Sequence, residues 1–409
     1  MLAPSQCSGC AHTRPSNLAP VNSALATRPC RRGILPSKPS LQISCLAPLF
    51  PAHPLKLWTA KSVGRVTASA MAQAPMQPGA EEQRGVTMNQ FLTWSGAPAQ
   101  MILLMQALQT ATKIIASKVA SAGVEGLGDK LGAGADSGDR DAQKKLDVVA
   151  NEVLKTALAA SNVVGVMASE EDDEPCIVDG QDSSKHVVVF DPLDGSSNIA
   201  ASIPTGTIVG VYARKGEDAA QDVLQPGEQQ VAAAYSLYSS ATMMVISVGS
   251  GTHGFTLLPT IGEFILTHPN ISIPARGQMY SLNDARQHDW PAGLRNYITK
   301  IQKGEGQSGK QYSARYICSL VADFHRTLLY GGWAGNPRSH LRLVYEANPL
   351  SYLCEQAGGR GSDGVSHILS IPVTKLHQRL PFFAGSPEDI SELESYGDVQ
   401  QVGTKKYDV

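Results

Sequence analysis

The 409-residue sequence predicts a layered α/β fold, and three observations support this. Some segments have apolar residues at helical spacing, others are short β-branched runs of strand length, and the two kinds are interleaved along the chain. The composition, with 42% hydrophobic and 17% charged residues, is that of a globular enzyme. The net charge of −2 does not suggest a nucleic-acid partner, and no apolar stretch is long enough to predict a membrane span.

The elements follow from periodicity and from breaker residues. The predicted helices are 101–119, 145–158, 322–329 and 350–357. The predicted strands are 163–168, 186–190, 208–212, 231–237, 243–248, 341–345 and 382–384. The Gly- and Asp-rich stretch 126–140 predicts a mobile loop, and the polar stretch 272–277 predicts a boundary between two halves.

The N-terminal stretch differs in composition from the rest of the chain. No Asp or Glu precedes Glu81, whereas Arg, Ser, Ala and Pro are frequent. Such composition is typical of an organelle transit peptide, and the alternative is an ordinary disordered basic tail. We expect residues 1–70 to be a disordered transit peptide, with cleavage near Val66-Thr67-Ala68 and a mature protein that begins near Ser69.

One nonapeptide carries the clearest chemical signal: Phe190-Asp191-Pro192-Leu193-Asp194-Gly195-Ser196-Ser197-Asn198. Two carboxylates three residues apart follow a predicted strand, and Gly195 permits a tight turn. After such a turn successive backbone N–H groups can face one concavity, which is how proteins hold a phosphate. Acids beside a phosphate need a cation between them, and hard oxygen ligands favour Mg²⁺ or Mn²⁺. The alternative is a turn with solvated acids.

Further acids occur near other predicted element ends. The run Ser169-Glu170-Glu171-Asp172-Asp173-Glu174 follows the strand 163–168. Acid runs are usually solvated faces, but a strand end beside Asp191 would let Glu170 bridge metals and Glu171 activate water. Asp141 and Asp147 flank two lysines, a pattern that by itself indicates a helix N-terminus.

Residues 86–396 resemble the class I fructose-1,6-bisphosphatases. The shared motifs are FDPLDGSSN, SEED, KKLDV, YSLN, SARYICSLVADFHRTLLYGG, LRLVYEANP and EQAGG. The last of these, with GRGSDG, is most similar to the plastid branch. The resemblance implies an αβαβα sandwich of the sugar-phosphatase type, with a metal- and 1-phosphate-binding domain at 86–271 and a sugar- and 6-phosphate-binding domain at 272–405. It also implies a homotetramer in the plastid stroma that uses Mg²⁺ to hydrolyse the 1-phosphate of fructose 1,6-bisphosphate, yielding fructose 6-phosphate and phosphate.

The resemblance also implies a role for each site residue. The metal ligands would be Glu170, Asp191, Asp194, Glu346, the Leu193 carbonyl and Asp141. Glu171 and Asp147 would position and deprotonate the attacking water. The 1-phosphate would be held by Gly195, Ser196, Ser197 and Asn198, and Arg342 would order the loop that carries Asp141. The 6-phosphate would be held by Asn283, Arg315 and Tyr316, with Arg315 reaching across from a neighbouring subunit.

The sequence departs from the family pattern near the 6-phosphate site. Arg286 stands where the family usually has a Tyr. Gly331–His340 is a shortened loop that lacks a phosphate-binding Tyr and has His340 in place of a Lys. Either Arg338 substitutes there, or the distal phosphate binds more weakly, or a gene model lacks a few codons. Near the metal site, Ala200 replaces an Asp.

Two regulatory sites of the family are not expected in this chain. The stretch 214–224 is short and has no Cys, where thioredoxin-controlled plastid enzymes carry a cysteine-bearing insertion. Cys318 lies in an apolar run, ARYICSL, that indicates burial, away from the other cysteines. Pro98 and Ile102 stand where AMP-binding enzymes have hydroxyl residues. We therefore expect control by neither dithiols nor AMP.

Three other functions remain as alternatives. The first is a sedoheptulose-1,7-bisphosphatase or a dual-specificity sugar bisphosphatase; sedoheptulose-1,7-bisphosphatases share the fold and metal site, but they usually have Ile in place of Asn198 and lack YSLN. Inositol-monophosphatase-like enzymes lack a second phosphate site. A regulatory protein that has lost catalysis is the third alternative, and the retained acids argue against it.

Overall fold

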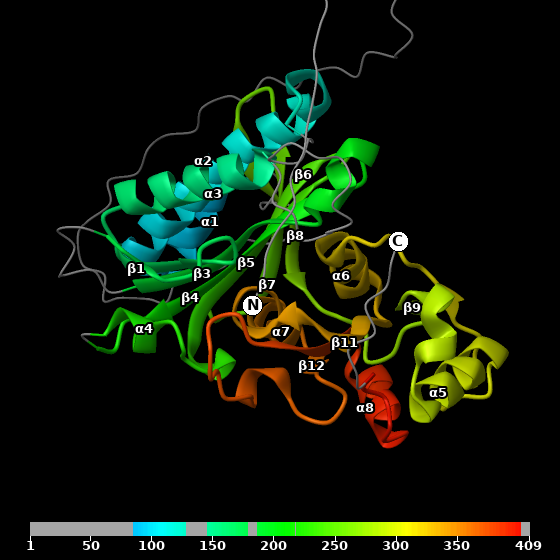
Figure 1. Cartoon of the computed structure of the whole chain (residues 1–409). Helices are drawn as coiled ribbons and strands as arrows, with labels where there is room; N and C mark the ends of the chain where they lie inside the picture. Colours follow the sequence, from blue (N-terminus) through cyan, green and yellow to red (C-terminus); the bar gives the residue numbers. More distant parts are fainter. Residues whose placement is uncertain (1–84, 128–144, 179–185, 217, 402–409) are drawn as a thin grey trace, which may run out of the picture. The chain divides into compact units, whose positions relative to one another are not determined.

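The computed structural model describes residues 85–127, 145–178, 186–216 and 218–401. The predicted transit peptide, most of the predicted loop 126–140, and Asp141 lie outside these ranges. The elements form five layers in the order helices, sheet, helices, sheet, helices (Figure 1), which confirms the predicted layered α/β class. None of the helices described here is long and apolar enough to cross a membrane.

The first sheet has eight strands in the order β2-β1-β3-β4-β5-β6-β7-β8. Their bounds are β1 Val164–Ser169, β2 Cys176–Ile177, β3 His186–Asp194, β4 Thr205–Ala213, β5 Gln230–Tyr238, β6 Thr242–Ser247, β7 Thr252–Leu258 and β8 Glu263–Ile271. β1 and β3 are parallel, and the other neighbours are antiparallel. In β3, Val188 and Phe190 belong to one core while Val187 and Val189 belong to another. This alternation buries both faces and explains why β3 is a continuous apolar run.

Three helices cover one face of this sheet (Figure 1): α1 Met88–Trp94, α2 Ala99–Glu125 and α3 Lys145–Ala160. α1 begins with a capping box between Thr87 and Gln90, and α2 ends at Gly126, whose φ is +64°. The apolar stripe of α2 includes Leu104 and Leu108, which are fully buried against the sheet. The predicted helical spacing of these residues is confirmed.

The second sheet has the order β10-β9-β11-β13-β12. Its bounds are β9 Met279–Ser281, β10 Ser313–Ala314, β11 Trp333–Arg342, β12 Arg360–Ser362 and β13 Arg379–Gly385. The helices α6 Leu320–Tyr330 and α7 Asn348–Gln356 fill the core between the two sheets, and α5 Ala292–Lys303 and α8 Pro387–Ser395 cover the outer face. The short elements are α4 Ala219–Asp222, η1 Ser196–Ala201, η2 Gly227–Gln229, η3 Asp284–Asp289, η4 Leu343–Ala347 and η5 Ile368–Ser370. In the sequence, the stretch 272–277 connects β8 of the first sheet to β9 of the second.

Two predictions about the region 331–345 are wrong. Gly331–His340 is not a loop, because β11 begins at Trp333, whose side chain is fully buried and stacks on Tyr280. The predicted strand 341–345 ends at Arg342, and Leu343–Ala347 forms a π-helical turn. A short apolar run fits a strand or a buried turn equally well, so its periodicity could not distinguish them.

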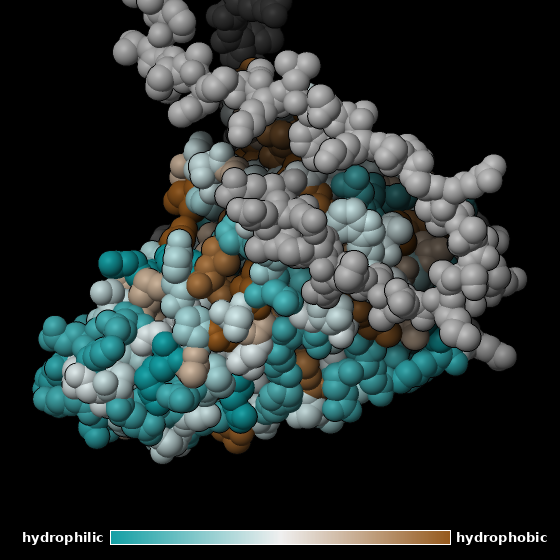
Figure 2. Space-filling view, turned by 180° about the vertical axis from the view of Figure 1, so that it is seen from behind, coloured by the Kyte–Doolittle hydropathy of each residue, from teal (hydrophilic) through white to brown (hydrophobic). Residues whose placement is uncertain are grey.

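The surface is mainly polar, with local apolar areas. Figure 2 shows hydrophilic side chains over much of the lower part of one face and hydrophobic side chains nearer its middle. On α2 the outward positions include Leu103 and Ile114, which are 47% and 43% exposed. Scattered apolar side chains of this kind are normal on a globular surface, and they indicate no particular partner.

Candidate active site

The ends of two neighbouring parallel strands place the first acids together. Ser169, the last residue of β1, pairs in register with Phe190 of β3. The Glu170 N–H donates to the Phe190 carbonyl at 3.0 Å, which extends the pairing by one residue. Carboxyl ends of adjacent parallel strands open at the same edge of a sheet. Glu170 and Asp191 are therefore neighbours, although they are far apart in sequence.

A bulge at the end of β3 orients its two carboxylates. Asp191 pairs with Ile208 and Asp194 with Gly206, so β3 advances three residues while β4 advances two. The Leu193 N–H donates to Asp191 Oδ1 at 2.9 Å, and the Val321 N–H donates to Asp194 Oδ2 at 3.1 Å. Both carboxylates are thus fixed by backbone donors rather than left to rotate in solvent.

The π-helical turn η4 supplies a third carboxylate from the other half of the chain. Glu346 is only 4% exposed, and its side chain accepts a hydrogen bond from the Arg342 N–H. One carboxylate oxygen from each of Asp191, Asp194 and Glu346 lies within 4.8 Å of the others. A π-helical turn inside a helical region is often found at functional sites.

These acids strongly perturb one another. Burial raises the pKa of Asp191 and of Glu346 well above the usual range, and the charge of Glu170 adds to both shifts. Burial also raises the pKa of Asp194 to about 7, although the Val321 N–H opposes this rise. Arg342 contributes a positive charge through its ion pair with Glu170. A buried group of oxygen donors at this spacing fits a divalent cation, because a cation would relieve the repulsion.

The acid run after β1 divides between two roles. Asp172 pairs with Lys155 of α3 at 3.2 Å and accepts a hydrogen bond from Asn151 at 2.9 Å, so it ties the run to α3. Asp173 and Glu174 are exposed, as in an ordinary solvated face.

Glu171 is half-buried beside Ser169, whose hydroxyl accepts its N–H at 3.2 Å. Asp147 is 3% exposed and lies in the first turn of α3.

The turn after β3 has the geometry that its sequence predicts. Gly195 has φ +75° and begins η1, and the Asn198 N–H donates to the Gly195 carbonyl at 2.8 Å. Ser196 is half-buried and Ser197 is exposed, so both hydroxyls lie near solvent. The Asn198 amide donates to the Cys318 carbonyl at 2.7 Å. In this structure Asn198 therefore holds the turn against the segment before α6.

Ser319 is a candidate that the sequence did not indicate. Its side chain is 1% exposed, and its hydroxyl has no hydrogen-bond partner among the described residues. The hydroxyl would lie 3.9 Å from a Cβ placed on Gly195. Buried hydroxyls normally have a partner, so this one is available to a ligand at the turn. Only the fold brings Ser319 to Gly195, and no local pattern distinguishes it from other serines.

The predicted distal-phosphate residues lie at the edge of the second sheet. The Arg315 N–H donates to the Tyr280 carbonyl at 2.8 Å, and the side chains of Arg315 and Tyr316 are exposed.

The expectation that Cys318 is buried is wrong, because its side chain is exposed. Cys318 has φ +67°, so the chain turns sharply here and the thiol accepts a hydrogen bond from the Tyr316 hydroxyl at 3.2 Å.

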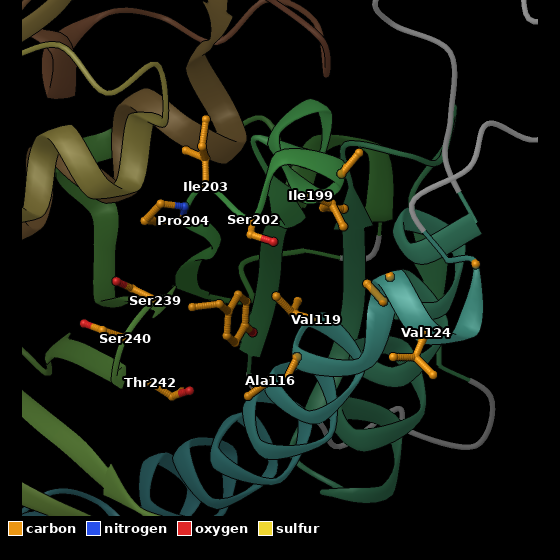
Figure 3. Close-up of a pocket in the computed structure, with 16 residues that line it drawn as sticks. Ala116, Val119, Val124, Ile199, Ser202, Ile203, Pro204, Ser239, Ser240 and Thr242 are labelled. Atoms are coloured by element: carbon orange, nitrogen blue, oxygen red, sulfur yellow. The ribbon is translucent and has the colours of Figure 1, made fainter.

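A separate cavity of about 710 Å³ lies beside η1 (Figure 3). Its walls come from the C-terminal half of α2, from η1 and the residues after it, and from the turn between β5 and β6. Figure 3 shows Val119 and Ile199 on one side and Ser239 and Thr242 on another. The lining contains no acid and no base, so the cavity lacks the groups that phosphate chemistry requires.

Comparison with known proteins identifies the family. Two family models match the sequence: the N-terminal domain of fructose-1-6-bisphosphatase over residues 85–269, and its C-terminal domain over residues 273–398. The chain belongs to the fructose-1,6-bisphosphatase family. Members of this family are metal-dependent phosphatases, and the acidic cluster described above could hold a metal ion.

Individual relatives agree with this assignment. The chain is 42% identical to the chloroplastic fructose-1,6-bisphosphatase of Brassica napus, over 82% of this chain and 88% of that protein. It is 45% identical to the class 1 fructose-1,6-bisphosphatase of Chloroherpeton thalassium, over 74% of this chain and 88% of that protein. The structure is similar to the crystal structure of Leishmania major fructose-1,6-bisphosphatase in holo form, with a TM-score of 0.72 and 38% identity over 77% of this chain and 99% of that one.

Replacing Asp194 with Asn should abolish turnover without unfolding the protein. The substitution removes one ligand charge, and the amide can still accept the Val321 N–H. Loss of one such stabilising group costs on the order of 100-fold or more in rate. The measurement is phosphate release, with circular dichroism as the check on folding and Asp173→Asn as the exposed control. A variant that retains more than about a tenth of the rate contradicts this role for Asp194.

Metal affinity and turnover should both rise as the pH increases through neutrality. A carboxyl whose pKa is raised keeps its proton to higher pH, and a protonated carboxyl cannot act as a metal ligand. Because the pKa of Asp194 is raised to about 7, protons compete with metal until the pH exceeds that value. Titration calorimetry with Mg²⁺ and steady-state rates across pH provide the test. A profile with its maximum below about pH 6, near the upper end of ordinary carboxyl titration, would contradict it.

Proposed function

We propose that this protein is a Mg²⁺-dependent fructose-1,6-bisphosphatase of the plastid stroma, of a plastid type without the redox-regulatory insertion. It would hydrolyse the 1-phosphate of fructose 1,6-bisphosphate and release fructose 6-phosphate and phosphate. One observation carries the proposal: the carboxylates of Asp191, Asp194 and Glu346 converge beside the Gly195 turn in a chain of this family. Several relatives are named chloroplastic, which supports the location and the interpretation of residues 1–70 as a transit peptide.

The cation would be held by Glu170, Asp191, Asp194 and Glu346, with the Leu193 carbonyl and Asp141 as further ligands. Bound Mg²⁺ would supply Lewis-acid stabilisation of charge on the transferring phosphoryl group, and Mn²⁺ fits the same oxygen donors. The buried, mutually repelling carboxylates support this assignment, because their ionised forms require a counter-charge.

The remaining groups act on water and on the two phosphates. Glu171 and Asp147 would orient the attacking water and accept its proton. Water oxygen then forms the new bond to phosphorus while the bond to the sugar C1 oxygen breaks, and that oxygen takes up a proton. The N–H groups of Gly195 and Ser196 would bind the 1-phosphate with the help of Ser197 and Asn198. Arg342, which pairs with Glu170 in this structure, would help to order the loop that carries Asp141.

The 6-phosphate would bind at the edge of the second sheet. Asn283, Arg315 and Tyr316 would contact it, with Arg315 contributed by a neighbouring subunit of a homotetramer. The exposed position of Arg315 supports this assignment, because an exposed guanidinium can contact a neighbouring subunit.

Phosphate release from two sugar bisphosphates tests the proposal. The form that begins at Ser69 should hydrolyse fructose 1,6-bisphosphate when Mg²⁺ is present and lose activity with a chelator. Fructose 6-phosphate is the control, because it lacks the scissile group and should release far less phosphate. Faster turnover of sedoheptulose 1,7-bisphosphate would favour the related bisphosphatase instead. Absence of phosphate release from either substrate would favour a non-catalytic protein.

The enzyme should be indifferent to dithiol reduction and to AMP. The cysteines in the described ranges, Cys176, Cys318 and Cys354, are free thiols, and Cys354 is buried. α2 begins after Pro98 without a side-chain cap, so hydroxyl donors for a nucleotide phosphate are not provided at this turn. Rates should stay within about twofold, a free-energy change below roughly 0.5 kcal/mol, with reduced thioredoxin or millimolar AMP. A severalfold change in either assay would reveal a regulatory site elsewhere.

A further inference from the structure

Three parallel strand ends meet at one edge of the second sheet. β10 pairs with β9 through Ala314 and Tyr280, and β9 pairs with β11 through Tyr280 and Trp333, both in parallel. Chains that leave adjacent parallel strands do so at the same edge, which is where ligands bind in such sheets. Asn283 follows β9, Arg315 and Tyr316 follow β10, and the segment beyond Ala334 continues along β11.

At this edge β11 leaves its regular pairing. Asn336 pairs with Phe382 and Leu341 with Leu380, so β11 advances five residues while β13 advances two. The additional residues form a bulge that contains Arg338. Because Ala334 pairs with Ser281, the last residue of β9, the bulge that follows lies at the edge where β9 ends.

The bulge has a fixed backbone. The Arg338 N–H donates to Asn336 Oδ1 at 3.1 Å, and the Gln401 N–H donates to the Pro337 carbonyl at 2.7 Å. Arg338 also forms an isolated parallel bridge with Gln401. Contacts on both sides of Arg338 therefore restrict its main chain, so the side chain projects from a defined point.

The charge of Arg338 reaches Tyr316. Burial raises the pKa of the Tyr316 phenol, and the guanidinium of Arg338 opposes that rise, which requires the two side chains to be near each other. Arg338 is half-buried, so its charge is less screened by solvent than that of a fully exposed arginine.

We infer that Arg338 binds the 6-phosphate from the same chain and replaces the Tyr and Lys of the family's longer loop. The inference rests on the proposed function, since it concerns the distal phosphate of that substrate. A guanidinium binds a phosphate through two parallel N–H donors, which can replace a hydroxyl and an ammonium together. Arg286, half-buried in η3 three residues after Asn283, is a second cation near the same edge.

Arg338→Ala should raise KM for fructose 1,6-bisphosphate by roughly 10- to 100-fold, the effect of losing one charge-assisted contact. kcat should fall much less, because the distal phosphate is held equally in the ground state and the transition state. Calorimetry should show a comparable loss of affinity for fructose 6-phosphate, which carries only the distal phosphate. Arg338→Lys should recover part of both effects, because it keeps the charge but not the paired donors.

Arg295→Ala is the matched control, because Arg295 is an exposed arginine on α5 and should leave both measurements unchanged. Thermal unfolding of each variant verifies that the bulge remains folded. An Arg338→Ala protein with wild-type KM and wild-type affinity for fructose 6-phosphate overturns the inference while leaving the proposed function intact. A wild-type protein that releases no phosphate from fructose 1,6-bisphosphate overturns the proposed function itself.

Discussion

Repulsion among buried carboxylates is the constraint on which the rest of the site depends. Asp191 and Glu346 are 3% and 4% exposed. Ionising either carboxyl group at such a buried position has a high desolvation free energy unless a counter-charge is present. Arg342 provides one positive charge at Glu170, but four carboxyl groups meet here. A rigid fold must therefore keep the acids together in the absence of metal, and the two sheets with η4 do this.

The site requires both halves of the chain. The first sheet contributes Asp191 and Asp194, and the second half contributes Glu346 from a turn beside α7. Two hydrogen bonds join the halves at the same place: Val321 N–H to Asp194, and the Asn198 amide to the Cys318 carbonyl. Because α6 begins at this junction, movement of one half relative to the other would alter the carboxylate cluster and the Gly195 turn together. Chemistry and overall packing are thus coupled.

The local parts of this arrangement could be predicted from sequence, but the non-local parts could not. Asp191, Asp194 and Gly195 follow one another along a strand and a turn, so their pattern is visible within nine residues. Glu346 was named only through the resemblance to the family, because its π-helical turn has the same apolar composition as a short strand and periodicity alone does not mark it as a site. β7 and β8 were not predicted, since Thr, His and Asn interrupt their apolar alternation. The position of Ser319 depends on tertiary packing against the Gly195 turn.

The two ends of the proposed substrate site tolerate sequence change to different degrees, for a physical reason. At the metal end, charge, burial and donor geometry are interdependent, so altering one carboxylate changes the pKa values of the others. At the distal end the requirement is only a positive, hydrogen-bonding surface around a phosphate, which different side chains can provide. A bulged strand that carries Arg338 can therefore meet the requirement at the distal end, whereas the acids of β3 and η4 at the metal end depend on one another. Contacts with the distal phosphate are the same in the ground state and in the transition state, so substitutions there change substrate affinity more than the rate of the chemical step. We therefore expect sequence variation to be greater at the distal end than among the carboxylates.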